Sequence, residues 1–257
     1  MRRGGLLLAG IACFAAPSLA APPPVTIVAH RGLSQGMPEN TLAAFRRAAE
    51  RGVRVIEVDL RTTKDGQIVL LHDATLDRTT DCSGPVSGLM LLRLGKCDAG
   101  TGERVPTFAE ALGFIKTVPA RLLLDIKPGT PLEDVIRQVR EQHAEGRVIF
   151  GLRRAKDIAR VRAELPAATT LAFMADAASA DKHAAAGAHI LRLWSDWVEA
   201  DPAIVARTRA LGPDVWIMVG RRLPGSKRQW QELHSRMTAS GGQGIITDRP
   251  DLVEQAP

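Results

Sequence analysis

Short apolar runs alternate with longer segments of helical spacing along most of the chain. Each run holds about four to eight mostly apolar residues, which is typical of buried strands. The runs are 25–29, 53–60, 68–71, 122–126, 148–151, 170–174, 190–193, 215–219 and 244–247. Strands that alternate with helices predict repeated βα units and a parallel sheet.

Helical patterns lie between most of these runs. We expect helices at 40–51, 107–117, 131–145, 154–164, 178–186, 201–211 and 227–239. Two of them carry start signals. Glu39-Asn40-Thr41 precedes the first helix, and Thr107 is followed three residues later by Glu110. Glu39 and Asn40 can either cap this helix or support site residues; we favour the cap for Asn40 and leave both roles open for Glu39.

Nine runs are one too many for a (β/α)₈ barrel, the fold that the 257-residue length suits. Asp65-Gly66 lies between two of the runs and is a hairpin turn signal. With these as the two central turn residues, Asp59 faces His72. We therefore predict a single-domain (β/α)₈ TIM barrel in which 68–71 is a returning hairpin arm. Residues 73–105 form a long cysteine-containing loop, so the hairpin and this loop are inserted after the second strand.

The first 20 residues have the pattern of a signal peptide. Arg2 and Arg3 precede a short apolar stretch at 6–16, and Ser18-Leu19-Ala20 is a small-x-small cleavage pattern. The stretch is too short to span a bilayer, and no later one is longer. We expect residues 1–20 to be removed, residues 21–257 to form the domain, and the protein to be exported to the periplasm or the medium. Acylation of Cys13 is a less favoured alternative.

Cysteine content and charge narrow the function classes. After removal of Cys13, Cys82 and Cys97 remain, and a pair in an exported chain favours a disulfide. The net charge is +6, but Lys and Arg are scattered rather than clustered on one segment. That distribution argues against nucleic-acid binding and suits an anionic small-molecule substrate.

Polar residues interrupt the apolar runs, and a buried charge is costly unless it is paired or bound to metal. They fall at or near the carboxyl ends of strands, where barrel enzymes place their active sites. They are His30 and Arg31 after the first run, Glu57 and Asp59 in the second, His72 after the hairpin return, and Asp125 and Lys127 near the fourth.

These residue types predict a metal-assisted reaction. Glu57, Asp59 and Asp125 offer oxygen ligands of the kind that Mg²⁺ or Ca²⁺ prefers. His30 and His72 suit proton transfer in both directions, one imidazole accepting a proton while the other donates one.

Arg31 and Lys127 complete the set, because cations stabilise the charge on a transferring phosphoryl group. Metal ligands, an acid–base pair and an anion clamp together indicate phosphodiester cleavage. Lys127 has an alternative role as a simple ion-pair partner of Asp125.

The order and spacing of these motifs resemble the glycerophosphodiester phosphodiesterase family. The motifs are HRG at 30–32, PENT at 38–41, EVD at 57–59, TKDG at 63–66, HD at 72–73, VPTF at 105–108, DIK at 125–127 and GIITDRP at 244–250. The resemblance implies a barrel that converts glycerophosphodiesters to glycerol 3-phosphate and an alcohol. It also implies acid–base roles for His30 and His72 and metal binding by Glu57 and Asp59, with attack on phosphorus by the free glycerol hydroxyl.

Two departures from the family pattern bear on the site. Asp125 stands where the family usually has Glu, one methylene longer, and Trp216 is followed by Ile-Met-Val-Gly rather than Thr-x-Asn. We expect altered metal affinity and a changed pocket for the alcohol. A lysophospholipase D and a non-catalytic phosphodiester-binding protein stay as alternatives. The ion and the oligomeric state stay open, and His143, His183, His189 and His234 are expected to be structural or surface residues.

Overall fold

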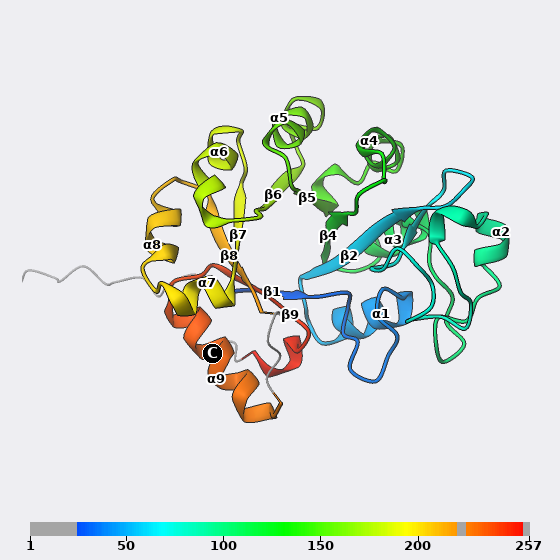
Figure 1. Cartoon of the computed structure of the whole chain (residues 1–257), viewed down its shortest axis with the longest axis horizontal. Helices are drawn as coiled ribbons and strands as arrows, with labels where there is room; N and C mark the ends of the chain where they lie inside the picture. Colours follow the sequence, from blue (N-terminus) through cyan, green and yellow to red (C-terminus); the bar gives the residue numbers. More distant parts are fainter. Residues whose placement is uncertain (1–24, 220–224, 254–257) are drawn as a thin grey trace, which may run out of the picture.

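Eight parallel strands close into a barrel, as predicted. The computed structural model describes residues 25–219 and 225–253, so the expected signal peptide lies outside the described residues. The strand order is β1-β9-β8-β7-β6-β5-β4-β2, and β1 also pairs with β2, which closes the barrel (Figure 1). The barrel strands are β1 (Thr26–Ala29), β2 (Val55–Thr62), β4 (Arg121–Ile126), β5 (Val148–Leu152), β6 (Thr169–Phe173), β7 (Ile190–Trp194), β8 (Asp214–Met218) and β9 (Gly244–Thr247).

Helices surround the barrel, one or two after most strands (Figure 1). They are α1 (Leu42–Glu50), α3 (Phe108–Ile115), α4 (Leu132–Glu141), α5 (Ala155–Glu164), α6 (Ala180–Ala185), α7 (Ser195–Ala200), α8 (Ile204–Arg209) and α9 (Lys227–Ala239). The predicted Thr107–Glu110 capping box is present at α3. The expected cap at Asn40 is wrong, because Thr41 is the N-cap of α1 and its side chain accepts a hydrogen bond from the Ala44 N–H. The short helix α7 was not predicted.

Both faces of the barrel strands are buried, and alternate residues face opposite sides. On β4, Leu123 belongs to the core inside the barrel, whereas Leu122 and Leu124 pack in the core between barrel and helices. Val55 of β2 is likewise internal. The period of two therefore points Glu57, Asp59 and Asp125 into the barrel.

The hairpin arm β3 (Ile68–Leu70) runs antiparallel to β2, as predicted, but its register differs from the prediction by one residue. Leu60 pairs with Leu70, and the Leu71 N–H donates to the Asp59 carbonyl at 3.1 Å. The predicted pairing of Asp59 with His72 is wrong. Gly66 has φ +76° and is the third loop residue rather than the second, so the loop holds one more residue than an Asp-Gly two-residue turn.

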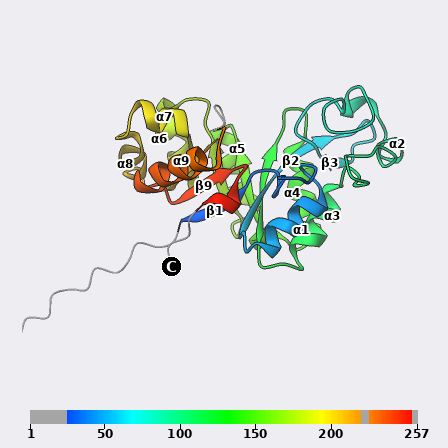
Figure 2. The ribbon, with the colours of Figure 1, turned by 90° about the horizontal axis from the view of Figure 1, so that it is seen from below.

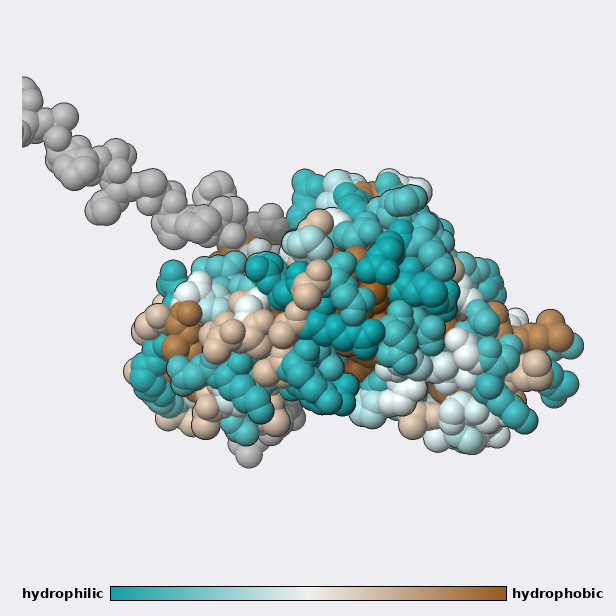
Figure 3. Space-filling view, turned by 90° about the horizontal axis from the view of Figure 1, so that it is seen from above, coloured by the Kyte–Doolittle hydropathy of each residue, from teal (hydrophilic) through white to brown (hydrophobic). Residues whose placement is uncertain are grey.

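The insertion at 73–105 forms a lobe at one end of the molecule (Figures 1 and 2). It contains the unpredicted helix α2 (Leu91–Leu94) and a small core of its own that includes Leu76, Val86 and Leu94. Apolar surface is visible at the same end of the molecule in Figure 3, and Met90 and Leu92 are the exposed large hydrophobic side chains of the described residues.

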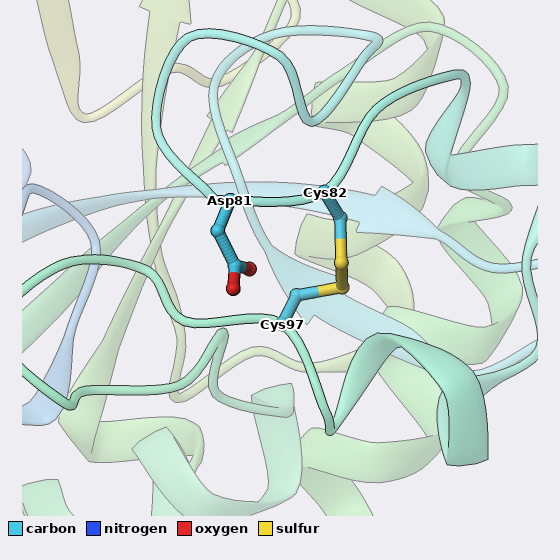
Figure 4. Close-up of side chains that lie close together, drawn as sticks. All are labelled: Asp81, Cys82 and Cys97. Carbon is cyan, nitrogen blue, oxygen red and sulfur yellow. A yellow bond between two sulfur atoms is a disulfide. The ribbon is translucent and has the colours of Figure 1, made fainter.

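The predicted disulfide between Cys82 and Cys97 is present and joins two segments of the lobe (Figure 4). Asp81 lies beside it and accepts a hydrogen bond from the Asp98 N–H at 2.7 Å, which ties the same two segments together again. Within the described residues, no helix has the length and apolar character needed to cross a membrane.

Candidate active site

The turn after β1 directs the first site residues. Arg31 and Gly32 have φ +57° and +84°, two consecutive residues in the left-handed region. A Cβ at Gly32 would lie 2.8 Å from the Ala44 Cβ, so only glycine allows this turn to pack against α1. The turn aims the Arg31 N–H at the Glu57 carboxylate, to which it donates at 3.0 Å.

The three predicted carboxylates converge inside the barrel mouth. Asp59 of β2 and Asp125 of β4 are register partners, and Glu57 lies one inward position before Asp59. Each offers a carboxylate oxygen that lies within 4.8 Å of the others, and all three side chains are buried. The two-residue spacing on β2 and the parallel register of β2 with β4 therefore produce the cluster.

Cationic side chains neutralise two of these carboxylates. Lys127 Nζ lies 2.7 Å from Asp59 Oδ1 and 2.6 Å from Asp125 Oδ2. Arg31 Nε lies 3.3 Å from Asp59 Oδ2, and Arg153 Nη2 lies 2.6 Å from Asp125 Oδ1. Burial opposes the charged form of Lys127, but the two carboxylates outweigh burial and raise its pKa.

Among the described residues, the Glu57 carboxylate has no cationic side chain as close as those beside Asp59 and Asp125. Burial and the neighbouring charge of Asp59 raise its pKa to about 8, against the smaller opposing effect of His30. Its carboxylate accepts a hydrogen bond from the Arg31 N–H at 3.0 Å and lies 3.8 Å from His30 Nε2. The cluster therefore has a place for one more positive charge beside Glu57.

The donor set suits a hard divalent cation. All three groups are carboxylates, the ligands that Mg²⁺ and Ca²⁺ prefer at about 2.0–2.6 Å. An oxygen separation of up to 4.8 Å accommodates an ion between them. Glu57 is the most open of the three to an ion, because cationic side chains already contact both carboxylate oxygens of Asp59 and of Asp125.

Each of the two predicted imidazoles is held by a carboxylate through the same ring nitrogen. His30 Nδ1 lies 2.6 Å from Asp248 Oδ1, and His72 Nδ1 lies 2.7 Å from Asp73 Oδ1. Nε2 of each ring is then the nitrogen that can exchange a proton with a substrate. Burial lowers the pKa of His30, but Asp248 and Glu57 outweigh it and the pKa is raised, whereas burial dominates at His72 and lowers its pKa.

A chain of ion pairs connects the two halves of the site. Glu39 accepts from Arg31 at 3.0 Å and from Arg78 at 2.7 and 2.9 Å. Arg78 in turn donates to Asp73 at 2.5 Å, and Asp73 holds His72. The inserted lobe is thereby linked to the barrel mouth, which explains how a loop residue takes part in positioning a barrel-mouth histidine.

Asn40 positions a carboxylate rather than capping a helix. Its side-chain amide donates to Asp59 Oδ2 at 2.8 Å and accepts from the Asp59 N–H at 3.1 Å. The residue has φ +58°, a conformation that Asn tolerates better than most residues. This pair of hydrogen bonds fixes Asp59 in the buried cluster.

These groups line a cavity of about 440 Å³ at the barrel mouth. One side is lined by His30, Arg31, Glu57, His72, Asp125 and Lys127. The other side includes Arg153, Phe173, Met174, Arg192, Trp194 and Met218. Asp59 is buried beside Lys127, and Trp216 packs inside the barrel core. The structure thus gathers the seven predicted site residues in and around one cavity.

Comparison with known proteins identifies the family. The model of the "Glycerophosphoryl diester phosphodiesterase family" matches residues 30–252. The chain belongs to this family.

Individual family members are similar over parts or most of the chain. A glycerophosphodiester phosphodiesterase of Caldanaerobacter subterraneus is 41% identical over 136 residues, which cover 48% of this chain and 56% of that relative. Glycerophosphodiester phosphodiesterase 1 of Mus musculus is 43% identical over 112 residues, 40% of this chain and 34% of that protein. The aligned part of the chain thus spans about half or less of these relatives. The crystal structure of an Agrobacterium tumefaciens glycerophosphodiester phosphodiesterase superposes with TM-score 0.75 at 26% identity, covering 89% of this chain and 98% of that one.

Several site residues of this family member were not predicted. Asp248 directly follows β9, the same strand-end position that singled out His30. Arg192 interrupts the apolar strand β7, the same signal that singled out Glu57. Met218 and Phe173 carried no signal, because apolar residues on buried strands are normally core. The other four histidines are not among the residues that line the cavity, and His183 and His234 are buried with hydrogen-bond partners.

Proposed function

We propose that the protein hydrolyses glycerophosphodiesters to glycerol 3-phosphate and an alcohol, with a bound divalent cation. The observation that carries this proposal is one cavity lined by two carboxylate-held imidazoles, two acidic residues of a three-carboxylate cluster, and four cationic side chains. The activity for which the matched relatives are named supports the same reaction.

His30 and His72 divide the proton transfers. One Nε2 takes the proton from the attacking hydroxyl, and the other gives a proton to the alcohol oxygen as its bond to phosphorus breaks. Asp248 and Asp73 fix each ring through Nδ1 and favour its protonated form during the transfer. When the attacking hydroxyl is that of the glycerol, this step leaves a cyclic phosphate. The rings then exchange roles: one takes a proton from the water that opens the cyclic phosphate, and the other protonates the departing glycerol oxygen to give glycerol 3-phosphate.

Arg31 and Lys127 bind the phosphodiester anion in this proposal. Both line the cavity. Burial opposes their charged forms, but nearby carboxylates outweigh it and raise the pKa of each, so both are positively charged near neutral pH. Lys127 reaches the substrate by shifting from its two carboxylate partners. Glu57, Asp59 and Asp125 would hold the cation. When bound, it supplies charge stabilisation at the non-bridging phosphoryl oxygens.

Phe173, Met174 and Met218 make the far wall of the cavity partly apolar and keep a lysophospholipid substrate as a second candidate. Arg153 and Arg192 lie in the same wall and favour a polar head group instead. A non-catalytic binder has no need for two imidazoles that are each held by a carboxylate.

Purified protein, stripped with chelator, tests the proposal. It is given short-chain glycerophosphodiesters and lysophosphatidylcholine with Mg²⁺, Ca²⁺ or Mn²⁺, and free glycerol 3-phosphate and lysophosphatidate are measured. We expect glycerol 3-phosphate only when an ion is restored. Lysophosphatidate as the main product would favour the second candidate, and no product with any ion would favour a binding protein.

We also propose that the chain is exported. The proposal rests on the sequence pattern of residues 1–20 and on the Cys82–Cys97 disulfide, a bond that persists in oxidising compartments. Expression with and without residues 1–20, followed by fractionation and N-terminal sequencing of the extracellular or periplasmic form, tests it. An intact Met1 in every fraction would contradict it.

A further inference from the structure

The cavity wall opposite the catalytic pair is built around an aromatic ring. Phe173 ends β6, and its ring passes over Gly151 of β5, where a Cβ would lie only 2.2 Å from Phe173 Cε2. Glycine at this position therefore gives the ring its place in the barrel mouth. The wall is the half of the cavity remote from His30 and Glu57 in strand order.

Two guanidinium groups lie against this ring. The carbon centre of the Arg153 group is 5.4 Å from the Phe173 centroid, and that of Arg192 is 5.6 Å away. Arg192 also lies 4.2 Å from the Trp194 ring centroid and 5.7 Å from that of Trp197. These distances are within the range of cation–π attraction.

Arg192 is held rigidly in place. It points inward from β7 and is only 4% exposed, and its Nη2 donates to the Met174 carbonyl at 3.0 Å. A charged side chain fixed by aromatic faces and a backbone carbonyl keeps its position without a substrate. The wall therefore presents a pre-organised positive charge to the cavity.

The aromatic faces have a second consequence. Phe173, Trp194 and Trp197 are rings of the type that attracts quaternary ammonium groups as well as guanidinium groups. In this protein the Arg192 guanidinium already lies against these three rings. A cationic head group would therefore have to compete with Arg192 for the ring faces and would be repelled by its positive charge. An anionic group would instead find a guanidinium at the wall.

We propose that Arg192 selects substrates whose leaving alcohol carries a negative charge, and that it disfavours choline-type alcohols. The proposal rests on the proposed function and names the substrate class of the same site. The glycerol half of a glycerophosphodiester has no charge beyond the phosphodiester itself, so a second anionic group belongs to the alcohol.

Three glycerol phosphodiesters with small alcohols separate charge from size. Their alcohols are glycolate, ethylene glycol and choline, which carry charges of −1, 0 and +1. Binding is measured by calorimetry with His30→Ala protein in Mg²⁺, so that no turnover interferes. We expect the glycolate diester to bind roughly tenfold to a hundredfold more tightly than the ethylene glycol diester, the range of one hydrogen bond to a charged group, and the choline diester to bind most weakly.

Arg192→Gln in the same background tests the residue. It should bring the glycolate and ethylene glycol diesters to within about threefold of each other, whereas Arg192→Lys should retain part of the difference. Arg207→Gln is the matched control, because this arginine is exposed on α8 and pairs with Asp201. A purely structural role for Arg192 would weaken all three ligands alike and leave their order unchanged.

The result that overturns the proposal is specific. It fails if the choline diester binds as tightly as the glycolate diester, or if Arg192→Gln leaves their ratio as it was. The order in His30→Ala protein decides the matter if Arg192→Gln does not fold. Turnover by wild-type protein is followed separately: absence of hydrolysis of all three diesters would contradict the proposed function, while the binding order would still decide the selectivity.

Discussion

Asp248 offers the sharpest test of how the site is positioned. Its Oδ1 lies 2.6 Å from His30 Nδ1, and it has no predicted role in metal or phosphate binding. Asp248→Asn preserves shape but removes the charge that holds the imidazole and stabilises its protonated form. In the serine-protease triad the corresponding carboxylate acts in the same way.

The size of the effect follows from this hydrogen bond. Loss of one bond to a charged group costs about 1.5–3 kcal/mol. Since about 1.4 kcal/mol corresponds to a tenfold change in rate, we expect kcat to fall roughly tenfold to 150-fold. KM should change by less than about threefold, because Asp248 is not placed against the phosphate.

The assay is steady-state release of glycerol 3-phosphate from the ethylene glycol diester at saturating Mg²⁺. Asp251→Asn is the matched control, since Asp251 lies three residues after Asp248 and pairs with Arg249. We expect this control to retain wild-type kcat. Wild-type kcat in Asp248→Asn would refute the positioning role, and an equal loss in both variants would show a general effect on the C-terminal segment.

Three further predictions concern stability, each measured by urea unfolding. Joint replacement of Cys82 and Cys97 by Ala should cost about 3 kcal/mol, the loop-entropy value for a 15-residue separation, and reductant should then have no further effect. Gly32→Ala should cost roughly 2–4 kcal/mol, because the backbone is left-handed there and the new Cβ would lie 2.8 Å from the Ala44 Cβ. The control Gly52→Ala should cost about 1–2 kcal/mol, because Gly52 has φ +79° but no atom within 4 Å of the added Cβ. Equal losses in the two variants would contradict the packing argument. The Arg78 hydrogen bond lowers the pKa of Asp73 to about 2, so the ionised Asp73 stabilises the fold above about pH 4 and this stabilisation is lost as the pH falls toward 2. Asp73→Asn should remove roughly 1 kcal/mol of the pH dependence of unfolding, a value already reduced for partial solvent exposure. An unchanged pH profile would contradict this.

The barrel was predictable because its strands carry a clear signal. Apolar runs such as β4 and β9 lie within a residue or two of their predicted bounds. The same runs made their polar interruptions visible, and Glu57, Asp59 and Asp125 were found in that way. The closing of the sheet then brings together residues that lie far apart along the chain, such as Asp59 and Asp125.

Local conformation was less predictable. Asp65-Gly66 signalled a turn, but Gly66 adopts its left-handed conformation one loop position later than expected, which shifted the hairpin register. Asn40 had the side chain of a helix cap, yet its positive φ turns it toward Asp59 and leaves the cap to Thr41. These outcomes depend on tertiary partners that a local sequence pattern does not contain.

The far wall of the cavity shows a different limit. Phe173 and Met218 have the character of core residues, and only closure of the barrel places them in the cavity wall. Arg192 did carry a signal as a charge within a buried strand. Its aromatic partner Trp197 comes from α7, a six-residue helix without a strong sequence pattern, so its environment was not predictable.

The central claim is that Glu57, Asp59 and Asp125 hold one divalent cation beside His30. The most direct measurement is an anomalous difference map from crystals of the protein grown with Mn²⁺. We predict one peak at the barrel mouth, about 2.0–2.6 Å from oxygens of Glu57, Asp59 and Asp125, with Lys127 moved from its position between Asp59 and Asp125. A map with no peak at this cluster, with Lys127 still bridging the two aspartates at saturating Mn²⁺, would contradict the account.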